Sequence, residues 1–111
     1  QGKPIGQEIH APDEQLTRCK GYDHNFCLNS ADWCAEACDP TSGRVLRVQT
    51  SLPGVQLYCG NFLTAPFVRH QGFCLETQAW PDAPNQAWRA QCILAQGTEY
   101  AAHTCFEFTV K

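Results

Sequence analysis

The sequence predicts a mostly β protein built from antiparallel strands, with at most one short helix. Three observations support this fold class. Apolar and polar residues alternate from Gly43 onward, turn-forming glycines and prolines separate the alternating segments, and eight cysteines lie within only 111 residues. Alternation with a period of two is typical of strands that bury one face. We therefore expect an antiparallel sheet or partial β-sandwich, held together by disulfides.

The first part of the chain carries no strand or helix period. Residues 1–18 contain two prolines and two glycines, and we expect them to form an irregular N-terminal arm. Residues 19–111 are then the single β domain. Within it, the segment Asp32–Cys38 predicts a helical turn, with Ser30 as N-cap and Pro40 as the residue that ends it.

Strands follow in the rest of the chain. Two alternating segments, Arg44–Thr50 and Val55–Cys59, flank a turn at Ser51-Leu-Pro-Gly54. The segment Gly72–Gln78 predicts a third strand, and an irregular loop over Ala79–Arg89 holds Trp80 and Trp88. After Gln91–Leu94 and a turn at Gln96-Gly97, a last strand is expected around His103–Val110.

Cysteine usage predicts a secreted, disulfide-stapled protein. An even set of eight cysteines in a chain this small is typical of extracellular domains, with the pairing left open by sequence. Zinc is the alternative, but zinc sites favour CxxC steps and this chain has none, so we expect no metal. The eight predicted disulfide positions are Cys19, Cys27, Cys34, Cys38, Cys59, Cys74, Cys92 and Cys105.

Composition excludes two classes of partner. Eleven acidic and eight basic residues give a net charge of −3, without the basic field of a nucleic-acid binder. No apolar run approaches the ~18 residues of a membrane span, so no membrane partner is expected.

Twelve aromatic residues are more than a small stapled core needs. We expect a homo-oligomer or filament, with a monomer as the alternative.

Strand alternation places three polar side chains on the less apolar faces of two strands. In the second strand Gln56 points away from Val55 and Leu57, and in the third strand Glu76 and Gln78 point away from Leu75. A solvated sheet face is the simplest explanation of this pattern, and periodicity alone favours it. A binding face is the alternative.

Several segments resemble the last third of the aldose 1-epimerase (galactose mutarotase) family. They occur in the family's order, and the resemblance covers about residues 19–111. The matching segments are Gly21-Tyr-Asp-His-Asn-Phe26, Ser42-Gly-Arg-Val-Leu46, Pro53-Gly-Val-Gln-Leu-Tyr58, Gly60-Asn-Phe-Leu63, Gly72-Phe-Cys-Leu-Glu-Thr-Gln78 and Trp80-Pro-Asp-Ala83 with Asn85. The resemblance implies part of the family's large β-sandwich.

The resemblance also implies a sugar site. In the family, a glutamate at the position of Glu76 is the general base that takes the proton of the anomeric hydroxyl. Residues at the positions of Gln56 and Asp23 hold the sugar. Trp80 is a further candidate, because an aromatic ring stacks well on a sugar face. No cofactor is expected.

Catalysis also needs an acid at the ring oxygen, and in the family this is a histidine from the earlier two thirds of the chain. We expect His10, His24, His70 and His103 to be surface or structural residues.

The favoured hypothesis is a secreted, non-catalytic protein with a structural, self-assembling, signalling or defence role. The alternatives are a galactose-type carbohydrate-binding module, or an aldose 1-epimerase completed by another chain.

Overall fold

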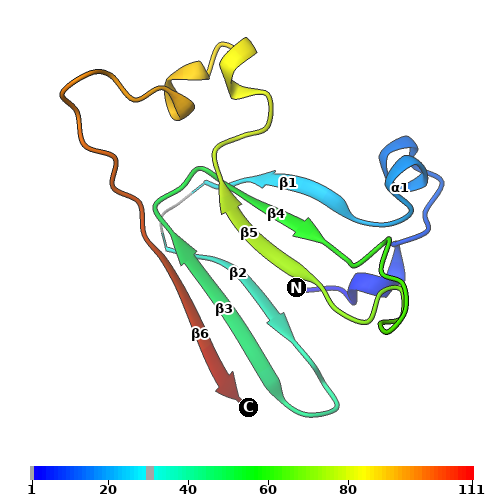
Figure 1. Ribbon diagram of the computed structural model, residues 1–111. Coiled ribbons are helices and arrows are strands. Elements are labelled where there is room, and N and C mark those ends of the chain that lie inside the picture. The colour runs from blue at the N-terminus through cyan, green and yellow to red at the C-terminus, as the bar shows by residue number, and fades with distance from the viewer. Residues whose placement is uncertain (1, 30–31) are drawn as a thin grey trace. The chain divides into compact units, whose positions relative to one another are not determined.

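The computed structural model describes residues 2–29 and 32–111, and it confirms the mostly β fold class (Figure 1). The chain divides into two compact units. The first comprises residues 1–25 and 56–76, and the second comprises residues 26–55 and 77–111. Each unit is assembled from two separate stretches of chain, and the boundary at residue 18 stays a prediction.

Within residues 2–29 and 32–111, six strands form two three-stranded sheets. One sheet has the order β1-β4-β5 and the other β2-β3-β6. The strands are β1 (Asp23–Cys27), β2 (Trp33–Cys38), β3 (Arg44–Thr50), β4 (Gly54–Tyr58), β5 (Cys74–Gln78) and β6 (Thr104–Val110). The strands predicted from alternation are confirmed as β3, β4, β5 and β6, with small differences at their ends.

The helical turn predicted for Asp32–Cys38 is wrong, because this segment forms strand β2. It pairs antiparallel with β3, so that Cys38 lies opposite Val45 and Ala37 opposite Leu46. Alanine and glutamate favour a helix locally, but pairing with a central strand outweighs that preference. The proposed N-cap, Ser30, lies outside the described residues.

Short helices occur where the sequence suggested irregular chain. Helix α1 (Glu14–Cys19) begins after Asp13, whose carboxylate accepts hydrogen bonds from the backbone N–H groups of Gln15 (2.8 Å) and Leu16 (3.2 Å). Asp13 is thus the N-cap of a helix in the segment that the sequence analysis expects to be irregular. Three single 3-10 turns complete the set: η1 (Ile5–Gln7), η2 (Ala83–Asn85) and η3 (Arg89–Cys92).

The predicted disulfide staples are absent from this structure. All eight cysteines lie in its described part, and no disulfide joins any two of them. The number of cysteines therefore did not predict their pairing, which requires Cα atoms about 4.4–6.8 Å apart with suitable geometry. Secretion was inferred from the staples, and it stays a prediction without that support.

Each unit has its own small set of buried side chains. Ile9, Leu16 and Cys59 are buried in the first unit, and Val45, Val48 and Val55 in the second. Burial raises the pKa of the Cys59 thiol above its ordinary value, with a smaller contribution from Cys74. Among the described residues, no helix has the length and apolar character that crossing a bilayer requires.

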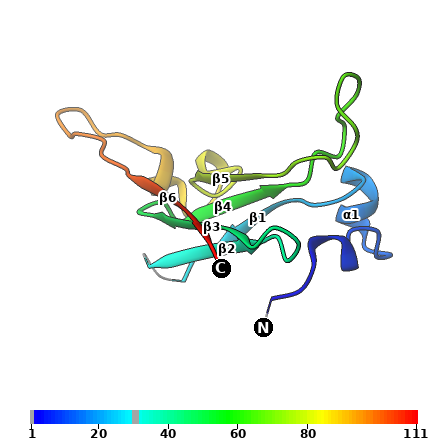
Figure 2. The same ribbon diagram turned by 90° about the horizontal axis from the view of Figure 1, so that it is seen from below.

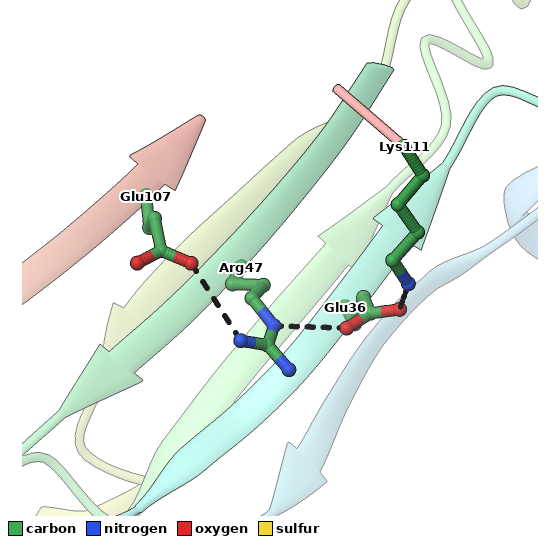
Figure 3. A network of polar contacts seen from close by, with 4 residues as sticks. All are labelled: Glu36, Arg47, Glu107 and Lys111. Atoms are coloured by element: carbon green, nitrogen blue, oxygen red, sulfur yellow. Dashed lines mark hydrogen bonds and ion pairs between the residues drawn. The ribbon is translucent and has the colours of Figure 1, made fainter. Parts of the chain in front are cut away.

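A row of charges crosses the β2-β3-β6 sheet. The register places Glu36, Arg47 and Glu107 directly opposite one another on the three strands. Arg47 Nε donates to Glu36 Oε2 at 2.9 Å, and Arg47 Nη1 lies 3.6 Å from Glu107 Oε1 (Figure 3). Lys111 Nζ donates to the other Glu36 oxygen at 2.9 Å. Glu36 is thus the carboxylate that two cations share.

We expect the substitution Glu36→Gln to have a pH-dependent effect on stability. Hydrogen bonds from Lys111 and then from Arg47 hold the pKa of Glu36 below its ordinary value of 4.5. A carboxyl whose pKa is lowered by folding stabilises the native state above its unfolded pKa, and this contribution is lost as the pH falls through the native pKa. Glu36→Gln should therefore be less stable than the wild type at pH 7, and the difference should shrink below about pH 4.5.

Urea unfolding at a series of pH values measures this difference. Glu99→Gln is the matched control, because Glu99 is exposed in the loop before β6 and is outside the charge row. Its stability should follow that of the wild type at each pH. A difference between Glu36→Gln and the wild type that stays constant from pH 7 to pH 3 would contradict the role given to the charge row.

Candidate functional site

The three residues that the resemblance marks as a sugar site lie on three neighbouring strands. Asp23 begins β1, Gln56 is the middle residue of β4, and Glu76 is the middle residue of β5. The sheet order β1-β4-β5 places the strand of Gln56 between the other two. All three residues belong to the first unit. The three residues thus lie on three adjacent strands of one sheet.

Asp23 and Gln56 are in direct contact. The Gln56 side-chain amide donates through Nε2 to Asp23 Oδ1 at 2.8 Å, and both side chains are half-buried. The bond places the two side chains on the same face of the sheet. It also fixes the direction of the Gln56 amide, because the nitrogen faces the carboxylate. The result is a polar pair with donor and acceptor groups.

Glu76 is exposed on β5, where Leu75 and Thr77 on either side of it are half-buried. This agrees with the alternation seen in the sequence, which put Glu76 on the more polar face, whereas Gln78, expected on the same face, is half-buried. Glu76 therefore lies on the exposed side of its strand, accessible to a ligand.

Trp80 lies in the second unit, and its indole N–H donates to the Pro53 carbonyl at 2.8 Å. Its ring meets Trp88 edge to face, with centroids 5.6 Å apart. These contacts give Trp80 a structural function in holding the segment after β5. Its predicted sugar contact stays a prediction.

Asn61 ties the end of β4 to the start of β1. Its side-chain Nδ2 donates to the Tyr22 carbonyl at 2.9 Å, and the backbone N–H of Cys59 donates to the same carbonyl at 3.1 Å. Tyr22 directly precedes Asp23. Asn61 was part of a matching sequence segment, but nothing in the sequence gave it this function, because the contact spans 39 residues.

His70 closes the loop that joins β4 to β5. Its backbone N–H donates to the Gly60 carbonyl at 3.1 Å, and its Nδ1 lies 2.8 Å from the Cys59 carbonyl. A carbonyl only accepts, so Nδ1 carries the proton. Arg69 adds a bond to the Lys20 carbonyl at 2.6 Å. The loop itself projects beyond the strand ends (Figure 2), and these bonds fix its base.

The remaining histidines have structural surroundings or are exposed. His24 Nδ1 accepts a hydrogen bond from the Asp23 backbone N–H at 2.9 Å, and its ring packs against Tyr22. His10 meets His70 edge to face, and His103 donates its backbone N–H to Ser51 Oγ at 3.1 Å. His24 is next to the polar pair, but its Nδ1 is occupied as an acceptor.

An open pocket of about 400 Å³ lies elsewhere in the first unit. Its wall includes Ile5, Ile9, His70 and Phe73, and it does not include Asp23, Gln56 or Glu76. In the described part of the chain, no three His, Cys, Asp or Glu side chains gather as a possible metal site. The polar strand face is therefore the better candidate for a binding site.

Comparison with known proteins identifies the family of this chain. The family model for aldose 1-epimerase matches residues 1–107. The chain therefore belongs to the aldose 1-epimerase family. The match includes residues 1–18, which the resemblance seen in the sequence had left out.

Individual relatives are identical to this chain at a third or more of the aligned positions. Galactose mutarotase from Homo sapiens is 44% identical and that from Bos taurus 48% identical, each over 97% of this chain. Aldose 1-epimerase from Escherichia coli (strain K12) is 35% identical over 96% of it. In each case the match covers 34% of the relative. The chain thus spans about a third of the length of these curated relatives.

Proposed function

We propose that this chain forms the base-bearing part of an aldose 1-epimerase site. The Gln56–Asp23 hydrogen bond of 2.8 Å is the observation that carries the proposal. It pairs two of the residues that the family resemblance assigns to the sugar, on strands that neighbour each other in one sheet. Glu76 follows on the next strand. Membership of the family gives the reaction class.

In the proposed reaction, Glu76 takes the proton of the anomeric hydroxyl. The electron pair of that O–H bond forms the carbonyl at C1, the bond from C1 to the ring oxygen breaks, and the ring oxygen receives a proton from an acid. Rotation about the C1–C2 bond and ring closure then give the other anomer. Asp23 accepts hydrogen bonds from sugar hydroxyls, and the Gln56 amide, oriented by Asp23, positions the sugar against Glu76.

The acid is proposed to come from protein outside these 111 residues. The chain matches only a third of each relative, and one ring nitrogen, Nδ1, of both His24 and His70 already contacts a backbone group. General acid catalysis typically contributes 10²–10⁴-fold in rate. A small acid in solution should therefore restore part of the rate that the chain lacks without its own proton donor.

Polarimetry of α-D-galactose in imidazole buffers tests this proposal. The protein-dependent rate of anomer exchange should rise with the concentration of imidazolium, after subtraction of the protein-free rate in the same buffer. Glu76→Gln should abolish this protein-dependent rate, while Glu99→Gln, a change of the same kind in an exposed loop, should leave it intact. A protein-dependent rate that is equal in wild type and Glu76→Gln would refute the function given to Glu76.

Carbohydrate binding without turnover is the second candidate. It is favoured by the same backbone contacts of His24 Nδ1 and His70 Nδ1, and it still uses the pair Asp23 and Gln56. NMR titration with D-galactose distinguishes the two. Under this alternative, the backbone signals of Asp23 and Gln56 shift on titration and Gln56→Ala abolishes the shifts, while no protein-dependent exchange of anomers is observed in imidazole.

A further inference from the structure

Strand β6 has an open edge. The order β2-β3-β6 pairs one side of β6 with β3 and places no described strand on its other side (Figure 1). The backbone N–H of Lys111 donates to the Gly43 carbonyl at 2.9 Å, and the carbonyl of His103 accepts from Ser51 at 3.1 Å. The odd-numbered residues thus direct their backbone groups toward β3.

The even-numbered residues of β6 therefore direct their backbone groups outward, because successive residues of an antiparallel strand alternate in direction. Three of them also carry exposed apolar side chains on one face of the sheet. Phe106 is 47%, Phe108 76% and Val110 74% exposed. An exposed apolar strand with unpaired backbone groups is a template for pairing with another strand.

We propose that β6 pairs antiparallel with β6 of a second copy of this chain, with Phe108 opposite Phe108 of the second copy. Outward backbone groups meet only when even-numbered residues lie opposite even-numbered residues. When the pairing is centred on Phe108, Phe106 of each copy lies opposite Val110 of the other copy. It uses the outward groups of all three apolar residues and forms roughly six backbone hydrogen bonds.

Charge and backbone pairing distinguish this register from its two neighbours. A pairing centred on Glu107 would place two carboxylates directly opposite each other, which is destabilising. A pairing centred on Thr109 would leave the outward groups of Phe106 unpaired. In the register centred on Phe108, Glu107 lies diagonal to Lys111 of the second copy, within reach of a long side chain.

The opposite edge of this sheet is less suited to pairing. The register of β2 shifts between Trp33 and Ala35, which is a β-bulge or irregularity at that edge. Bulges protect edge strands from pairing with other chains. Association through β6 alone consumes the open edge of both copies and closes as a two-fold dimer, whereas pairing at both edges would give a filament.

Sedimentation of the full chain over a range of concentrations tests the dimer. The wild type should change from monomer to dimer as concentration rises. Phe108→Lys, which opposes two cations on the two-fold axis, should raise the dimer dissociation constant at least tenfold. Ile93→Lys is the matched control, since it introduces the same charge at an exposed apolar residue outside β6, and it should dimerise as the wild type does.

Amide hydrogen exchange of the wild type is a second test that needs no variant. The amides of Phe106, Phe108 and Val110 should be protected at dimer concentrations and should exchange rapidly on dilution. The amides of Cys105, Glu107 and Thr109, bonded to β3, should be protected in both states. A monomer at all concentrations, or protection of the even-numbered amides that does not change on dilution, would overturn the proposal.

Discussion

Replacing Gly21 with alanine is expected to lower the free energy of unfolding by about 2–4 kcal/mol. Gly21 has φ +140°, a conformation that side chains rarely adopt, so the substitution strains the backbone. A Cβ at this position would also lie 2.3 Å from Asn61 Oδ1 and 3.2 Å from a carbon of the His70 ring. Asn61 is only 2% exposed and bonds to the Tyr22 carbonyl, so it has no easy way to move.

The matched control is Gly97→Ala. Gly97 also has a positive φ, +81°, but a Cβ there would meet nothing within 4 Å. Its cost should be the backbone strain alone, about 1 kcal/mol. Urea unfolding followed by far-ultraviolet circular dichroism measures both losses. Equal losses in the two variants would show that the contact with Asn61 and His70 is not what makes Gly21 necessary.

The strands that the sequence predicted are those whose side-chain pattern is local. In β3, Val48 and Thr50 are buried on one face while Arg47 and Gln49, which alternate with them, are less buried, so the chain itself carried the signal. In β2 the order Trp-Cys-Ala-Glu-Ala-Cys alternates poorly, and only its pairing with β3 makes it a strand. Local preference was therefore sufficient for the central strand and misleading for its neighbour.

The candidate site was predictable in part. The positions of Asp23, Gln56 and Glu76 came from resemblance, and alternation gave the exposed face of Glu76. The bonds of Asn61 and His70 that hold the strands of this site together were not predictable, because they join residues far apart in the sequence through backbone carbonyls. Such contacts depend on how the loop returns to the sheet, which no pattern of residue types specifies.

Val48→Ala is expected to lower the free energy of unfolding by about 2 kcal/mol. Val48 is 0% exposed in the central strand β3, opposite Ala35 on β2 and Phe106 on β6. Removing two methylene equivalents there loses about 0.8 kcal/mol each in transfer free energy, and the cavity adds to this loss. Ala35 is too small to fill the space, so the site has little means of collapse.

Tryptophan fluorescence during urea unfolding measures this loss, since Trp33, Trp80 and Trp88 all belong to the same unit as Val48. Ile93→Ala removes a larger side chain, but Ile93 is 60% exposed in the same unit, so its cost should stay within about 0.5 kcal/mol. If the smaller deletion at Val48 cost no more than the larger one at Ile93, burial on β3 would not be the source of stability in this unit.

Because the contacts of Gly21 lie in the other unit, the fluorescence transition of Gly21→Ala also shows whether the two units unfold together. A shifted transition indicates one cooperative unfolding, and an unshifted transition indicates two.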